Sequence, residues 1–152
     1  MSSVYIVAEI GCNHNGDYNL AKLMIDEAYS AGVNAVKFQT FKADSLISKY
    51  APKAEYQIKT TGNSESQLEM TRKLELSCEE YIKLEEYSKS LGLDVFSTPF
   101  DLESIEFLYT RKQTTWKIPS GELLNLPYLE KIALLPGDKK IILSTGMATL
   151  AE

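Results

Sequence analysis

The chain has 152 residues, of which 44% are hydrophobic and 24% are charged, and this length and balance predict one soluble globular domain rather than a disordered chain. Its formal net charge of −5 argues against nucleic acid or an anionic membrane as a partner, because both require a basic surface. No apolar run approaches the roughly 20 residues of a membrane-spanning helix, and the first residues lack a secretory signal, so a cytoplasmic location is expected.

The first third of the chain alternates strand-like and helix-like segments. A short apolar run over residues 4–8 predicts a strand that is buried on both faces. A turn rich in glycine and asparagine follows at residues 11–16, and apolar spacings of three and four then predict a helix over residues 18–31. Residues 35–39 predict a second strand, and residues 42–66 are polar and irregular.

The alternation continues to the end of the chain. Ser77 and Glu80 form a capping-box pattern that opens a helix ending near Leu91. The later elements are a strand at 94–98, a helix at 101–111, a strand at 116–118, a helix at 127–135 and a strand at 140–144. Five strands with four helical crossovers predict an α/β fold, either an open doubly wound sheet or part of a (β/α)8 barrel. No G-x-G-x-x-G pattern follows the first strand, which disfavours dinucleotide binding.

Polar side chains gather at the end of every predicted strand, where barrel enzymes build their active sites. They are Glu9, Lys37, Gln39, Thr40, Ser97, Thr98, Lys117, Ser120, Glu122, Ser144 and Thr145. Lys37 and Lys117 stand inside otherwise apolar strands, and burying an unpaired ammonium group is costly. Three explanations remain open: an anionic ligand, a carboxylate partner such as Glu9 or Glu122 in a structural or a catalytic pair, or exposure on an edge strand.

The cysteines and the histidine give weaker signals. His14 lies in a turn of Asn and Gly residues and is interpreted as a turn residue rather than a metal ligand. Cys12 is interpreted as a small packing residue. Two distant cysteines do not suggest a disulfide framework, and with one histidine they cannot complete a structural zinc site.

Five short motifs, in the same order along the chain, resemble those of the sialic acid synthase family. They are Ala8–Gly11 with Asn13–Gly16, Val36–Thr40, Ser97–Asp101, Lys117–Glu122 and Leu143–Met147. The resemblance implies a TIM-type (β/α)8 barrel followed by a small antifreeze-like domain. It also implies a synthase that condenses phosphoenolpyruvate with N-acetylmannosamine or a related amino sugar to give N-acetylneuraminate, or a similar nonulosonate, and phosphate. The Pro-Ser-Gly-Glu form of the fourth motif looks more like the neuraminate and legionaminate branch than the pseudaminate branch.

The same resemblance assigns roles to individual residues. Glu9 and Glu122 are the catalytic candidates, for proton transfer or for orienting water and sugar hydroxyls. The expected substrate contacts are Lys37, Gln39, Asn63, Thr98, Lys117, Ser120 and Ser144. A divalent metal, Mn or Mg, is implied for the complete enzyme as a Lewis acid, held by two histidines on later strands. Because this chain has only His14, in a different motif, no metal is expected on it.

The resemblance covers only the first five strands of the barrel. Residues 1–152 are therefore expected to form its N-terminal part, without the later strands and the antifreeze-like domain, and to be inactive alone. Uncovered sheet edges predict a homo-oligomer. Two alternatives remain: a non-catalytic half-barrel interaction module, or another phosphoenolpyruvate aldolase, such as a legionaminate, pseudaminate or deoxy-heptulosonate phosphate synthase.

Overall fold

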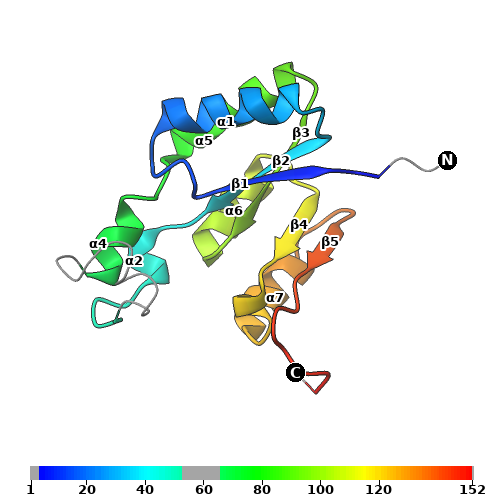
Figure 1. Ribbon diagram of the computed structural model, residues 1–152. Helices are drawn as coiled ribbons and strands as arrows, with labels where there is room; N and C mark the ends of the chain where they lie inside the picture. The colour runs from blue at the N-terminus through cyan, green and yellow to red at the C-terminus, as the bar shows by residue number, and fades with distance from the viewer. Residues whose placement is uncertain (1–3, 53–65, 152) are drawn as a thin grey trace.

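The structure, a computed structural model, describes residues 4–52 and 66–151 as an α/β fold of parallel strands (Figure 1). Three strands form one sheet in the order β1-β2-β3, and two further strands form a second sheet. The strands are β1 (Val7–Gly11), β2 (Ala35–Thr40), β3 (Asp94–Pro99), β4 (Thr115–Ile118) and β5 (Lys140–Leu143). Each pair within the two sheets is parallel, as the sequence predicts.

Four helices make the predicted crossovers. They are α1 (Tyr18–Ser30), α5 (Cys78–Ser90), α6 (Leu102–Thr110) and α7 (Leu126–Ala133). Helices α1 and α5 pack side by side along the first sheet, and α6 contacts both β3 and α7 (Figure 1). Among the residues described, no helix is long and apolar enough to cross a membrane.

Two short helices, α2 (Ala43–Leu46) and α4 (Gln67–Arg72), were not expected. They contact each other beyond the carboxyl end of β2 (Figure 1). Helix α4 starts with a capping box in which Ser66 Oγ accepts from the Glu69 backbone N–H at 3.2 Å and Glu69 Oε2 accepts from the Ser66 N–H at 2.7 Å. That Ser-x-x-Glu spacing is a sequence signal for the helix. The predicted irregular segment is thus helical near its start, and residues 53–65 lie outside the described residues.

The first strand begins three residues later than its apolar run suggests. Val4, Tyr5 and Ile6 are exposed, and the pairing of β1 with β2 starts at Val7. Asn34 bonds Ile6 instead, because its side chain accepts from the Ile6 N–H at 2.7 Å and its own N–H donates to the Ile6 carbonyl at 2.9 Å. Consequently Glu9 lies within the strand rather than after it, and it is in register with Lys37.

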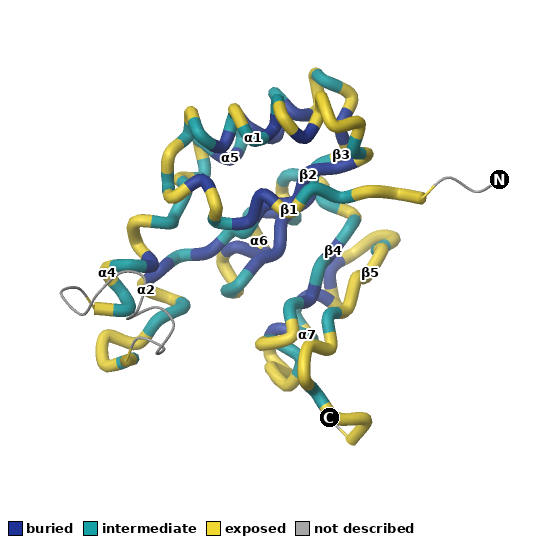
Figure 2. The backbone as a smooth tube through the Cα atoms, viewed as in Figure 1, coloured by how far each residue is buried: buried dark blue, intermediate teal, exposed yellow. Residues whose placement is uncertain are grey.

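One continuous core lies between the strands and the helices (Figure 2). Val36 and Phe38 of β2, and Trp116 and Ile118 of β4, belong to it together with buried residues of α1, α5, α6 and α7. Successive side chains of a strand point to opposite faces. The lysines between these residues, at positions 37 and 117, therefore point to the face of the strands that the helices do not cover.

Candidate functional site

Three side chains from three neighbouring strands meet at the helix-free face of the first sheet. Lys37 Nζ lies 2.8 Å from Glu9 Oε2 and donates to Thr98 Oγ1 at 3.2 Å. Parallel register brings them together, since Glu9 is opposite Lys37 and Thr98 is opposite the residue two positions further along β2. We call Glu9, Lys37 and Thr98 the lysine cluster.

The burial of the lysine cluster is uneven. The Lys37 side chain is 3% exposed and the Glu9 side chain is 60% exposed. Lys37 is therefore neither on an edge strand nor in solvent, which removes that explanation of its presence. An ammonium group carries three N–H donors, and Glu9 and Thr98 engage two of them. The third donor and the solvated Glu9 carboxylate give the cluster both a cation and a base for a ligand that approaches this face.

Gln39 is held by the loop that follows β1. Cys12 Sγ donates to Gln39 Oε1 at 2.5 Å, and a Cβ at Gly11 would lie 3.8 Å from the Gln39 carboxamide carbon. Burial raises the pKa of the Cys12 thiol, and the nearby Lys37 charge opposes that shift. The thiol therefore stays protonated and acts as a donor, a role beyond packing that sequence reasoning did not predict for Cys12.

A second glutamine supports β3 next to Thr98. Gln113 Oε1 accepts from the Ser97 N–H at 2.7 Å, and Gln113 Nε2 donates to the Ser97 carbonyl at 2.9 Å. The carboxamide thus takes the place of a neighbouring strand's backbone and satisfies both polar groups of one buried residue. Sequence reasoning missed Gln113, since no motif marks a side chain that substitutes for a strand.

Lys117 occupies the equivalent face of the second sheet. It is half-buried, and in residues 4–52 and 66–151 its side chain makes neither an ion pair nor a hydrogen bond. The Ser144 N–H donates to the Ile118 carbonyl at 3.0 Å, so Ser144 continues the β4–β5 ladder just beyond Lys117. Ser120 begins the 3-10 turn η1 (Ser120–Glu122). A Cβ added to Gly146 would lie only 2.7 Å from the Cβ of Ser120. The loop after β5 therefore approaches Ser120 closely.

Glu122 is not a partner of either lysine in the described residues. Its Oε2 accepts from Asn125 Nδ2 at 2.5 Å, at the start of α7. Burial, and to a lesser extent the Glu122 charge, raises the pKa of Tyr128, whose hydroxyl donates to the Pro99 carbonyl at 3.0 Å. Of the two carboxylates considered as lysine partners, Glu9 is therefore paired with Lys37, whereas the Glu122 carboxylate accepts from a local amide instead. Asn63 lies outside the described residues.

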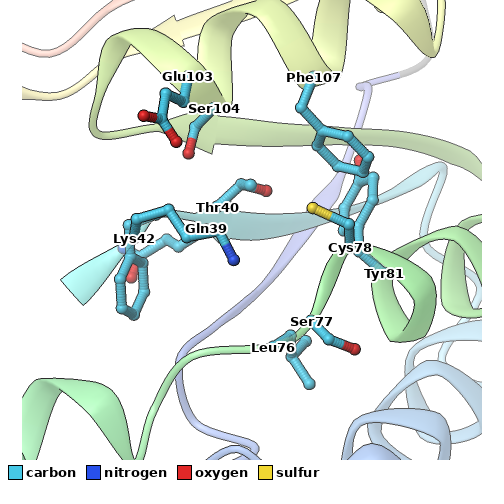
Figure 3. Close-up of a pocket in the computed structure, with 11 residues that line it drawn as sticks. Gln39, Thr40, Lys42, Leu76, Ser77, Cys78, Tyr81, Glu103, Ser104 and Phe107 are labelled. Atoms are coloured by element: carbon cyan, nitrogen blue, oxygen red, sulfur yellow. The ribbon is translucent and has the colours of Figure 1, made fainter. Parts of the chain in front are cut away.

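A cavity near this end of the strands is lined largely by residues at the start of α5 and by residues of α6 (Figure 3). Its volume is about 180 Å³. Its lining residues are Gln39, Thr40, Phe41, Lys42, Leu76, Ser77, Cys78, Tyr81, Glu103, Ser104 and Phe107. Figure 3 shows the Cys78 sulfur beside the Phe107 and Tyr81 rings. Of the residues predicted for the site, only Gln39 lines this cavity. The lysine cluster therefore does not lie in it.

The donor set does not fit a divalent metal in the described part of the chain. No group of three or more His, Cys, Asp and Glu side chains comes together there in an arrangement that could hold one. His14, the single histidine, is 1% exposed, and its Nδ1 accepts from the Gly16 N–H at 3.0 Å. This hydrogen bond closes the loop between β1 and α1, so His14 has a structural role there.

Burial of His14 makes the stability of the chain depend on pH. Desolvation lowers its pKa below 6.5, so the unfolded chain binds the proton more tightly than the folded one. The stability that comes from neutral His14 is complete above the unfolded value and is lost as the pH falls below it, by at most about 1.4 kcal/mol per pH unit. Urea unfolding at about pH 7.5 and about pH 5.5 is expected to show a larger loss for the wild type than for His14→Gln. Equal losses would contradict the assignment.

Comparisons with known proteins identify relatives along the whole chain. Residues 24–152 match the model of the NeuB family. The N,N'-diacetyllegionaminic acid synthase of Campylobacter jejuni is 54% identical over 100% of this chain and 45% of its own length. The enzyme of the same name from Legionella pneumophila is 49% identical over 97% of this chain and 41% of its own length.

A solved structure also matches the fold. The N-acetylneuraminic acid (sialic acid) synthetase of Leptospira borgpetersenii superposes with a TM-score of 0.77 at 32% identity, and the match covers 99% of this chain and 47% of that one. The chain therefore spans less than half the length of the relatives it matches.

Proposed function

The chain belongs to the NeuB family, and on that premise we propose that its lysine cluster and Lys117 bind phosphoenolpyruvate in a synthase that condenses it with an amino sugar. The fold is part of a TIM-type barrel, in which functional groups gather at the carboxyl ends of the strands. The observation that carries the proposal is the burial of Lys37 beside an exposed carboxylate. Two cations on the helix-free faces of the two sheets, one of them without a side-chain partner among the described residues, suit a ligand with two anionic groups.

Each anionic group of phosphoenolpyruvate has candidate partners on this face. Charge-assisted hydrogen bonds from ammonium groups to phosphate or carboxylate are the strong ones, and serine hydroxyls add directional donors. Lys37 and Lys117 would supply the charges, and Ser120 and Ser144, which follow β4 and β5, would supply hydroxyls. Thr98 contacts Lys37, and Gln39 is in register with Thr98. These roles are our proposal, as is a contribution from Asn63.

The chemistry that this arrangement would serve is carbon–carbon bond formation. C3 of phosphoenolpyruvate attacks the open-chain aldehyde, whose oxygen takes a proton. Water then adds to C2, and phosphate leaves from C2 with its bridging oxygen, which yields a 2-keto acid. Glu9 is exposed enough to reach substrate, and its carboxylate lies 2.8 Å from the Lys37 ammonium group, so it suits proton transfer or orientation of water. Glu122 remains a second candidate that would have to release Asn125 first.

The acceptor is proposed to be a sugar with two acetamido groups. The identity to the two legionaminic acid synthases is higher than the identity to the sialic acid synthetase, which favours an N,N'-diacetyl product over the N-acetylneuraminate that the motifs first suggest. Association with a second copy, a cytoplasmic location and inactivity of these residues alone stay predictions.

Turnover by the protein that carries this sequence tests the proposal. We expect phosphate release only when phosphoenolpyruvate and an acetamido sugar are both present, and faster release with the diacetamido acceptor. With ¹⁸O in the bridging position of phosphoenolpyruvate, the label should appear in the phosphate. Reaction only with a phosphorylated aldose would support the deoxy-heptulosonate type instead. Binding of phosphoenolpyruvate without turnover of any acceptor would support the non-catalytic module.

A further inference from the structure

A polar cavity lies at the amino ends of the strands, away from the lysine cluster. Its volume is about 280 Å³. It is lined by Tyr5, by the first half of β3, by the first residues of β4 and β5, by one side of α5 and by the loop between α6 and β4. Its lining extends along β3 to Phe96, which is in register with Lys37. The lining includes neither a residue of the lysine cluster nor Lys117, so the cavity is distinct from the candidate site.

The lining carries more positive than negative charge, although the whole chain has a net charge of −5. Its cations are Lys89, Arg111, Lys112 and Lys140, and its carboxylates are Glu85 and Asp94. Glu85 has a side chain that is 5% exposed, and it is neutralised twice, by Lys89 at 2.6 Å and by Arg111 Nε at 2.8 Å. Arg111 also lies 3.6 Å from Glu86, which is outside the lining.

The other charged residues of the lining are Asp94, Lys112 and Lys140, so positive charge is in excess among them. Partial desolvation of the Tyr5 hydroxyl, and the hydrogen bond that it donates to Asp94, raise the pKa of Tyr5 to about 12. The Lys140 ammonium lies 5.6 Å from the centre of the Tyr5 ring. In the described part of the chain, neither Lys112 nor Lys140 has an ion pair. Lys112 and Lys140 thus share a polar space in which Glu85 is already paired and the remaining carboxylate, Asp94, accepts a hydrogen bond from Tyr5.

Lys112 occupies a backbone position that glycine fills elsewhere in this chain. The residues directly after the caps of α1 and α5 are Gly32 (φ 76°) and Gly92 (φ 81°), and the corresponding residue after α6 is Lys112, with φ 62°. A side chain in this left-handed conformation is strained, whereas glycine is not. Glycine at position 112 would relieve this strain. Because Lys112 also lines the cavity, its side chain is a candidate for a role in binding.

We propose that this cavity is a second anion site, which binds the phosphate group of a small molecule between Lys112 and Lys140. The proposal does not depend on the function of the lysine cluster. The competing explanation is that Lys112 only complements the carboxyl end of the α6 dipole. The two explanations differ in whether removal of the side chain changes the affinity for phosphate.

The test is a titration of the chain with inorganic phosphate and, separately, with ribose 5-phosphate, monitored by backbone amide NMR. We expect residues 112–115 and 140 to shift, in the wild type and equally in a Lys37→Met background. Equal affinities would identify free phosphate as sufficient, and tighter binding of the ester would identify a phosphorylated metabolite. No shift at these residues with either probe would overturn the proposal.

Two variants separate binding from stability. Lys112→Gly is expected to raise the urea midpoint, because the strain is relieved, and to weaken binding at residues 112–115 by about fivefold to tenfold. Lys140→Gln should weaken binding similarly without the gain in stability. Lys83→Gln, which removes an exposed charge from α5, serves as the control for net charge and should bind like the wild type. Unchanged affinity in Lys112→Gly would leave only the helix-dipole role.

Discussion

Lys37→Met is expected to weaken phosphoenolpyruvate binding by about 100-fold while the chain stays folded. The substitution removes the buried cation that contacts Glu9 and Thr98 and keeps nearly the same side-chain volume. Glu9 is 60% exposed and can be hydrated, so no uncompensated buried charge remains. The free energy of unfolding should fall by less than about 2 kcal/mol, since the main cost is the lost partner of the Thr98 hydroxyl.

Calorimetric titration with phosphoenolpyruvate and urea unfolding of the same variant check both parts of this expectation. Lys22→Met is the matched control, because Lys22 also forms an ion pair, with Asp26 at 3.3 Å, but on helix α1. The control should bind like the wild type. If Lys37→Met unfolds the chain, Lys37→Gln provides a second measurement. A folded variant with an affinity within about twofold of wild type would show that Lys37 is only a structural ion-pair residue.

Lys117→Met is expected to weaken the same binding by at least about tenfold and to leave stability unchanged or higher. Lys117 is half-buried and, among the residues described, has no carboxylate or hydrogen-bond acceptor, so its desolvation is not compensated by the protein. A ligand anion would supply that compensation. The same two measurements apply, with Lys131→Met as control, since Lys131 is ion-paired with Glu106 on the helical side.

The double variant shows whether the two lysines act on the same group of the ligand. If both contact one anionic group, the losses of binding free energy in Lys37→Met and Lys117→Met should not add, because the two side chains share a partner. Additive losses would show that the lysines act independently, on different anionic groups or at different sites. A normal affinity in Lys117→Met alone would confine the anion site to the first sheet.

The sequence predicted the faces of the strands better than their partners. Alternation of Lys37 with Val36 and Phe38 was sufficient to place the lysine opposite the helices, because the period of two is a local property. Its partner Glu9 could not be predicted in the same way, because the pairing depends on the register of two parallel strands, and the two residues are 28 positions apart. The apolar run that starts at Val4 placed the start of the first strand three residues too early. Parallel register is set by long-range contacts such as those of Asn34, and composition does not encode them.

The residues around the lysines were harder to predict, for a similar reason. Glu122 is a carboxylate and could pair with a lysine, yet Asn125, three residues further on, donates a hydrogen bond to it instead. Gln113 makes two hydrogen bonds to Ser97, and Cys12 makes one to Gln39, all between residues far apart in the chain. Such bonds follow from tertiary packing, and no spacing in the sequence indicates them.

The most direct test of the account is an NMR titration of the chain with phosphoenolpyruvate, observed at the ¹³Cε signals of its lysines. The account predicts that the Lys37 and Lys117 signals shift together, with one dissociation constant, while Lys22 and Lys131 stay unchanged. The amides of Thr98 and Ser144 should follow the same curve. Shifts of other lysines, without Lys37 and Lys117, would show that the cations at the carboxyl ends of the strands do not form the phosphoenolpyruvate site.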